Sequence, residues 1–257
     1  MAAMVALFAG VIASLLRTVA LLNCYSTESG YFDKGNGGAL VTAMWAVAVS
    51  GVVFCAVICY MRRARIKEFE RVVGMKYMVG AVILVFALLI VFFHEMTSVF
   101  GDMSGTAING VCAAFALVSA VAVLTNAFIP AKGVKYTRAI FGLSTAVVCV
   151  LLAFEVYFTR DLVMNSPNKS VFILTIISAA MLVVFECRCS TEQRSPAVYT
   201  SLCLATLNLG LFSGVPGLIW WTLHRSDLTV SVAMDMICIA FAVYAIAGLY
   251  SMHHKLR

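Results

Sequence analysis

Charged residues are scarce in this sequence, and their scarcity excludes the commonest class of protein. Only 12% of the residues are charged, whereas 63% are hydrophobic and the mean hydropathy is +1.00. Soluble domains carry roughly 25% charged residues. The chain is therefore not a soluble globular domain.

The hydrophobic residues fall in long runs that short polar segments separate. Runs of about 17 to 25 residues have the length that a helix needs to cross a hydrocarbon core of roughly 30 Å. Cutting the chain at its charged or turn-rich segments predicts an all-α polytopic membrane bundle of eight transmembrane helices, with seven as the second choice. Residues 1–257 then form one transmembrane domain, with spans at about 3–22, 38–61, 77–100, 108–130, 139–158, 171–187, 199–223 and 230–252.

Two features of secreted proteins are also missing. The amino terminus has no basic leader region, and no small-residue cleavage site follows its first apolar run, so we interpret that run as a retained span. Nine cysteines are present, but only Cys24 falls in a predicted outer loop, while the others lie within or at the ends of apolar runs. This distribution predicts no disulfide framework.

Basic residues are concentrated in short segments on one face of the predicted bundle. The longest such segment, 62–76, places hydrophobic residues at helical spacing among its charges, which is typical of an amphipathic helix in the lipid headgroup region. With eight spans, most of the 18 Lys and Arg residues fall on the face that receives both termini, and the positive-inside rule places this face in the cytoplasm. We expect the segment to bind anionic lipid headgroups rather than nucleic acid. Its basic residues are Arg62, Arg63, Arg65, Lys67, Arg71 and Lys76.

A few ionisable residues nevertheless lie inside the predicted spans. At 1.5 Å per residue, Arg17, His94, Glu95, Glu155 and Asp235 all fall roughly 5 to 9 Å below the outer membrane boundary. A charge at the bilayer centre costs about 2.5 to 3.5 kcal/mol, and less toward the interface, so such residues usually face the bundle interior and pair with one another.

We therefore expect these five residues to form one ligand- or ion-binding site, in which a single cation faces three carboxylates. The surplus negative charge would favour sharing of a proton. One alternative is a buried ion-pair network that only fixes the register of the helices. A second alternative is a coincidence of depth without contact.

The seventh predicted span contains an unusual glycine and proline pattern. Gly210 and Gly214 form a GxxxG motif that allows another helix to approach closely, and Pro216, with a glycine after it, predicts a kink or break. Broken helices near the middle of a membrane often expose backbone groups to a substrate, and Asn208 lies close to that level. We therefore add Asn208 to the candidate site. The alternative is a packing motif with an incidental kink.

The common catalytic and metal-binding patterns are missing. Ser213 lacks the G-x-S-x-G spacing of a nucleophile elbow, and His94-Glu95 lacks the second histidine of the zinc-protease motif. We predict no catalytic residue, no metal site and no cofactor. The sequence 168–170 fits a glycosylation acceptor on a predicted outer loop, close to the sixth span.

The region around Arg17, followed by Thr27-Glu28-Ser29-Gly30-Tyr31-Phe32, resembles small multi-span membrane proteins of Gram-positive gut bacteria that have no assigned activity. The resemblance covers this short stretch. It implies a bacterial plasma membrane and no substrate.

Three functions are compatible with the sequence. The first is a small-solute or ion transporter, or a membrane sensor, with an outward-facing polar site that takes a small solute or a proton. The second is a non-catalytic accessory or assembly subunit, in which the buried polar residues are structural. The third is an intramembrane enzyme, which ranks last because no nucleophile with its base and no set of metal ligands is visible.

Overall fold

The computed structural model describes residues 2–26, 29–32, 38–63, 75–101, 107–128, 135–158, 166–191, 196–224 and 230–253. Within these residues the chain forms eight helices, each long and apolar enough to cross a membrane, and one two-stranded hairpin. The protein is therefore an all-α, multi-pass membrane bundle, as the hydrophobic runs predict.

The helices are α1 (Ala2–Cys24), α2 (Gly38–Met61), α3 (Met75–Gly101), α4 (Ala107–Phe128), α5 (Lys135–Phe158), α6 (Pro167–Ser190), α7 (Pro196–His224) and α8 (Val232–His253). The hairpin pairs β1 (Tyr25–Ser26) with β2 (Tyr31–Phe32) in antiparallel register. The main difference from the predicted spans is α6, for which residues 171–187 were expected. Hydropathy excludes the polar first turn of α6, but Asn168 and Lys169 in that turn are buried in the structure.

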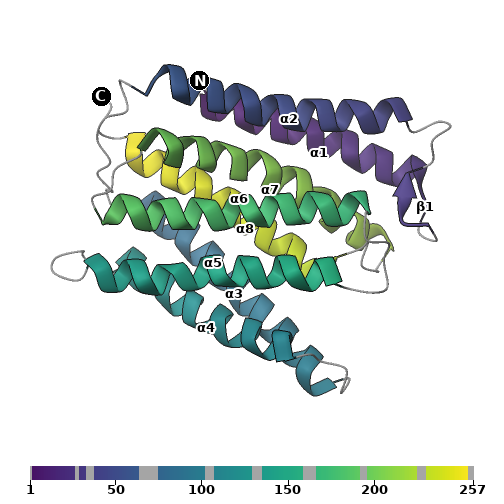
Figure 1. Cartoon of the computed structure of the whole chain (residues 1–257). Coiled ribbons are helices and arrows are strands. Elements are labelled where there is room, and N and C mark those ends of the chain that lie inside the picture. The colour runs from purple at the N-terminus through teal and green to yellow at the C-terminus, as the bar shows by residue number, and fades with distance from the viewer. Residues whose placement is uncertain are drawn as a thin grey trace.

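Consecutive helices run in opposite directions, so both termini lie at the same end of the bundle (Figure 1). We name this the terminal end, and the opposite end, which carries β1 and β2, the hairpin end. The eight-span count predicts the shared position of the termini, whereas their cytoplasmic location stays a prediction. Arg62, Arg63 and Lys76 are exposed at the terminal end, whereas Arg65, Lys67 and Arg71 lie outside the described residues.

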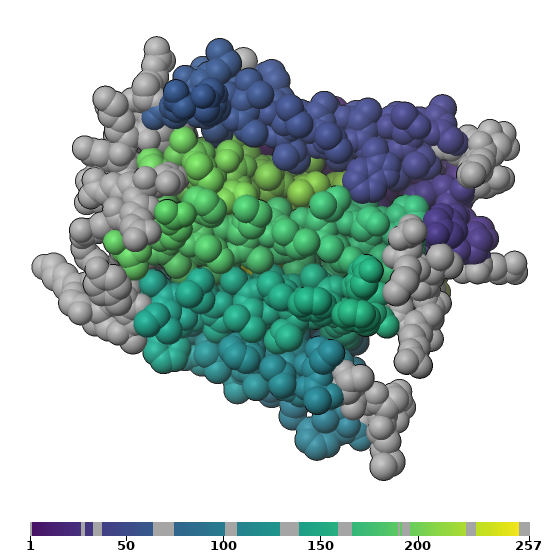
Figure 2. All heavy atoms as spheres, viewed as in Figure 1, coloured from purple at the N-terminus to yellow at the C-terminus, as the bar shows by residue number. Residues whose placement is uncertain are grey.

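α7 is the central helix of the bundle. It packs against α1, α2, α6 and α8, while α8 also packs against α3, and α4 and α5 complete the other side. α7 and α8 are the most buried helices, and α2 is the least buried. The pair α1 and α2 therefore forms one flank of the molecule, and α3, α4 and α5 form the other (Figures 1 and 2).

Small residues allow α7 and α8 to approach closely. A Cβ atom at Gly210 would lie 2.6 Å from the Cys238 carbonyl oxygen, and one at Gly214 would lie 2.6 Å from the Asp235 carbonyl oxygen. Only glycine fits such backbone contacts between membrane helices. α7 continues as one helix through Pro216, so the break that the sequence predicts as one possibility is absent.

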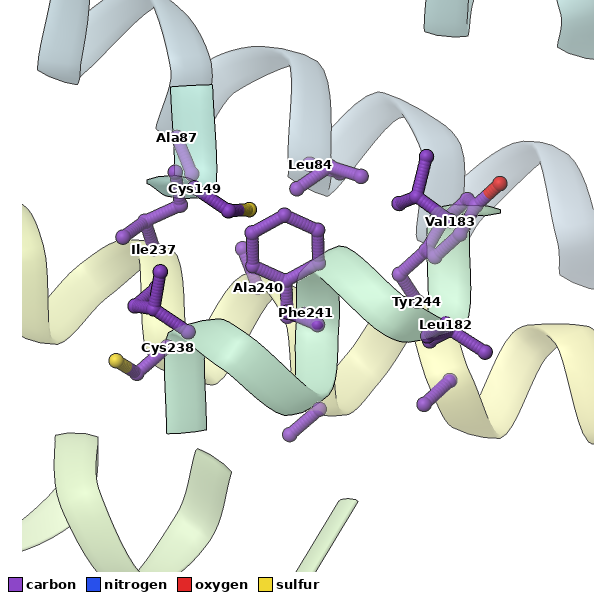
Figure 3. Close-up of a cluster of buried hydrophobic side chains, with 14 of the residues drawn as sticks. Leu84, Ala87, Cys149, Leu182, Val183, Ile237, Cys238, Ala240, Phe241 and Tyr244 are labelled. Carbon is purple, nitrogen blue, oxygen red and sulfur yellow. The ribbon is translucent and has the colours of Figure 1, made fainter. Parts of the chain in front are cut away.

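An apolar layer fills the middle of the bundle. Phe241 of α8 is fully buried and packs among Leu84, Cys149, Leu182 and Ile237 (Figure 3). These four side chains come from α3, α5, α6 and α8. The layer lies between the polar groups of the two ends.

Candidate functional site

The charged residues that were expected to share one site lie in two groups at the hairpin end. Arg17 and Asp235 lie against α7, whereas Glu95 and Glu155 lie between α3 and α5 on the other flank. Within the described residues, Arg17 donates hydrogen bonds to α6 and α7 and to neither glutamate, whereas Asn109 joins the two glutamates. The expected grouping of one cation with three carboxylates therefore divides into two sets of contacts.

His94 belongs to neither group by contact. Its side chain is half-buried, and its ring makes no hydrogen bond to another residue in the described ranges. Only its backbone carbonyl is used, as the acceptor for the hydroxyl groups of Thr97 and Ser98.

Arg17 fixes α1 against the backbone of α7. Its Nη1 donates to the carbonyl oxygens of Phe212 at 2.7 Å and Ser213 at 3.2 Å, and the residue is only 3% exposed. Pro216 explains the first bond: proline has no N–H, so the carbonyl four residues earlier lacks its usual helical donor. Arg17 supplies the missing donor, and its guanidinium also lies 5.4 Å from the centre of the Phe212 ring.

A second donor of Arg17 reaches α6. Its Nη2 donates to Oδ1 of Asn168 at 3.0 Å, and the Asn168 side chain is buried. The predicted glycosylation acceptor is therefore inaccessible, because its amide lies inside the bundle in the first turn of a helix. Sequence reasoning missed Asn168 as a partner of Arg17, since no pattern links residues so far apart in the chain.

Asp235 of α8 is the counter-charge of this region. Its carboxylate lies directly over Gly217 of α7, at the position that a Cβ atom would occupy. It attracts Arg17 electrostatically, although no hydrogen bond joins the two side chains in the described part of the protein. Opposite charges that are buried together offset part of their desolvation cost.

Asn208 lies one helical turn from Phe212, on the side of α7 that meets α1 and α2. The residue is fully buried, and neither Nδ2 nor Oδ1 has a hydrogen-bond partner among the described residues. Two glycines from neighbouring helices surround it: Gly51 of α2 lies against its amide, and a Cβ atom at Gly10 of α1 would lie 3.2 Å from its Cα. We name Arg17, Asn168, Asn208 and Asp235 the α7 group.

Glu95, Asn109 and Glu155 form a second polar group, which joins α3, α4 and α5. Asn109 Nδ2 donates to Oε2 of Glu95 at 2.7 Å and to Oε1 of Glu155 at 3.3 Å. The two carboxyl groups also lie within hydrogen-bond range of each other. Glu95 is fully buried, and its Oε1 has no hydrogen-bond donor in the described ranges. We name Glu95 and Glu155 the carboxyl pair.

A third polar group, at the terminal end, was missed in the sequence. Glu186 of α6 accepts hydrogen bonds from Tyr244 of α8 at 2.8 Å and from Tyr77 of α3 at 3.2 Å, and all three residues are buried. Glu186 lies one residue before the predicted end of the sixth span, where an acidic residue is easily taken for the end of the membrane segment. Its position just inside the span is the one sequence feature that indicates a buried acid.

These groups offer hydrogen bonding and charge. Among the residues that the structure describes, no group of three or more His, Cys, Asp or Glu side chains is arranged to hold a metal ion, and none of the nine cysteines forms a disulfide. Comparisons of the chain with protein families, curated proteins and solved structures found no match. The eight apolar helices make it a multi-pass membrane protein.

Proposed function

We propose that this multi-pass membrane protein is a transporter of a small polar solute and that the α7 group recognises the solute. The observation that carries the proposal is Asn208, a fully buried carboxamide whose donor and acceptor atoms both lack a partner among the residues that the structure describes. A buried polar group without a hydrogen bond costs roughly 1 to 3 kcal/mol, and no bulk water offsets this cost inside a bilayer. A solute that offers a donor and an acceptor would remove the cost.

Arg17 supports a solute that carries an acceptor group at one end. Its Nη atoms are occupied by carbonyl and amide oxygens, but its buried Nε has no hydrogen-bond partner in the described part of the chain. Phe212, whose carbonyl Arg17 binds, lies about 6 Å along α7 from Asn208 at 1.5 Å per residue. A solute of amino-acid or organic-acid size spans that separation.

The position of α2 suggests how a solute reaches Asn208. α2 is the least buried helix and packs chiefly against α1 and α7, with Gly51 lying against the Asn208 amide. Separation of α2 from α7 would therefore uncover the carboxamide without disturbing α3, α4, α5 or α8. Peripheral helices that move against a fixed core are a common basis of alternating access.

The test is a thermal-shift screen of amino acids, organic acids, nucleosides and small ions on the detergent-purified protein, followed by uptake of each positive solute into proteoliposomes. A ligand at 100 times its dissociation constant adds about 2.7 kcal/mol of stability. We expect Asn208→Leu to abolish the ligand shift and the uptake while keeping or raising the melting temperature, because it removes an unpaired polar group.

The matched control is Asn126→Leu, which changes a half-buried asparagine of α4 far from the α7 group. It should keep the ligand shift of the wild type. The proposal fails if Asn208→Leu binds the solute as the wild type does. It also fails if no solute acts and Asn208→Leu is strongly destabilised, since Asn208 would then be a structural residue of an accessory subunit.

A further inference from the structure

One oxygen of the carboxyl pair lacks a hydrogen-bond donor among the described residues. This atom, Glu95 Oε1, is buried, and it belongs to a side chain in hydrogen-bond range of Glu155. An ionised carboxylate accepts hydrogen bonds but cannot donate one. A hydrogen bond between two carboxyl groups therefore requires a proton on one of them.

We propose that Glu95 and Glu155 form an intramembrane proton-binding site that holds one exchangeable proton between them. The bound proton joins α3 to α5 by an O–H···O hydrogen bond and leaves one negative charge on the pair instead of two. Asn109 orients both acids by donating to the other oxygen of each. The proposal does not depend on solute recognition by the α7 group.

The orientation of Asn109 favours a proton over a metal cation. Its side chain presents the Nδ2 donor, and not the Oδ1 acceptor, to both acids. Sodium, calcium and magnesium ions are bound by oxygen atoms, and an N–H group directed at such an ion repels it. The same N–H group stabilises carboxyl oxygens that share a proton.

The titratable groups on the helices that pack against α3 and α5 define the surroundings of the pair. The amide of Asn109 donates a hydrogen bond to each of the two acids. Cys112 faces the pair from α4, and His94 precedes Glu95 on α3 with a half-exposed ring. The ionisable groups of the other helices that pack on α3 and α5 include Lys169 and Glu186 of α6 and Asp235, Cys238 and Tyr244 of α8.

The location of the pair suits exchange with one side of the membrane. Glu155 is three residues from the end of α5 at Phe158, and Glu95 is six residues from the end of α3 at Gly101, so both lie near the hairpin end. The apolar layer around Phe241, drawn in Figure 3, includes Leu84 of α3 and Cys149 of α5, which precede the two glutamates on these helices and so lie closer to the terminal end. Proton uptake from the hairpin side would couple that compartment to the packing of α3, α4 and α5.

The experiment combines infrared spectroscopy with thermal unfolding of the whole protein in detergent. At neutral pH we expect one carbonyl-stretch band of a buried protonated carboxylic acid, which is lost on strong alkalinisation. Glu95→Gln and Glu155→Gln should each remove that band. In the wild type the melting temperature should fall as pH rises, because loss of the proton leaves two negative charges in contact. Either glutamine variant should lose most of this fall, since its amide N–H replaces the shared proton.

The matched control is Glu186→Gln, which changes a buried glutamate that has tyrosine donors instead of a second acid. It should keep the infrared band and the pH-dependent fall. Absence of the band from the wild type at neutral pH would overturn the proposal even if a variant failed to fold. Persistence of the band in both Glu95→Gln and Glu155→Gln would overturn it as well, and neither result would affect the solute screen.

Discussion

Pro216 and Arg17 act on the same backbone carbonyl. Proline removes one helical hydrogen bond from α7, and the guanidinium of α1 replaces it at the Phe212 oxygen with a 2.7 Å bond. A proline inside a helix costs about 3 kcal/mol or more when nothing compensates. The pairing explains how α7 stays one continuous helix, and why a cation is tolerated in a buried position on α1.

This pairing predicts a coupled effect of two substitutions. Pro216→Ala restores an N–H group that can bond the Phe212 carbonyl, so Arg17→Gln should cost less stability in that background than in the wild type. We expect a coupling energy of about 1 kcal/mol, within the range for residues that share a partner. The measurement is a double-mutant cycle of unfolding free energies in detergent.

Pro196→Ala is the matched control for that cycle. Pro196 is the first residue of α7, where a proline leaves no helical carbonyl without its donor. Arg17→Gln should therefore cost the same with or without Pro196→Ala. Equal costs in the Pro216→Ala and wild-type backgrounds would show that Arg17 does not compensate for the proline.

At the residue scale, the sequence predicts which side chains are buried better than it predicts their partners. Hydropathy identifies Arg17, Glu95, Glu155 and Asp235 as charges inside spans, and Arg17, Glu95 and Asp235 are buried. Arg17 donates to backbone carbonyls and to Asn168, and the two glutamates accept from Asn109. Nothing in the sequence distinguishes these groups from others of the same type until the helices are placed.

At the element scale, α7 presents three glycines to α8. Gly210 and Gly214 meet carbonyl oxygens of α8, and Gly217 meets the Asp235 carboxylate. The GxxxG motif in the sequence predicts a close helix contact but does not identify the partner helix. Gly217 lies outside that motif, so its role in seating a buried charge becomes visible only in the structure.

Gly217→Ala should displace the Asp235 carboxylate and destabilise the protein. The new Cβ would occupy the position of that carboxylate, and overpacking of this kind costs about 1 to 3 kcal/mol. Gly110→Ala is the matched control on α4, because no heavy atom of the described residues lies within 4 Å of its Cβ position. The control should be neutral or more stable by roughly 0.5 to 1 kcal/mol from helix propensity.

Melting temperatures of the two glycine variants provide the measurement, and Asp235→Ala provides the internal check. If the cost of Gly217→Ala comes from contact with the carboxylate, it should largely disappear when Asp235→Ala is already present. Similar melting temperatures for Gly217→Ala and Gly110→Ala would contradict the close contact at Gly217.

At the scale of the whole molecule, the number of helices is predictable and their neighbours are not. The eight hydrophobic runs correspond to eight helices, because the length of an apolar run determines whether it can span a membrane. α7 packs against α1 and α2, and α3 packs against α8, although these helices are not neighbours in the sequence. Lipid chains are as apolar as leucine, so the faces that meet lipid and the faces that meet helices have similar hydropathy.

Buried polar groups tie together helices that are distant in the chain at both ends of the bundle. At the terminal end Glu186 joins α6 to α3 and α8 through two tyrosine hydroxyl groups. At the hairpin end Arg17 joins α1 to α6 and α7. The apolar layer around Phe241 lies between them, so that each end has its own directional contacts while the middle is held by packing.

Tyr244→Phe should destabilise the bundle more than Tyr77→Phe does. The Tyr244 hydroxyl contacts both carboxylate oxygens of Glu186 at 2.8 Å, whereas Tyr77 contacts one of them at 3.2 Å. Loss of a donor to a buried charged group costs about 1.5 to 3 kcal/mol. Tyr157→Phe, on an exposed part of α5, is the control and should change the unfolding free energy by less than about 0.5 kcal/mol. Equal stability of the Tyr244→Phe and Tyr157→Phe variants would mean that packing alone, without the Glu186 hydrogen bonds, holds α3, α6 and α8 together at the terminal end.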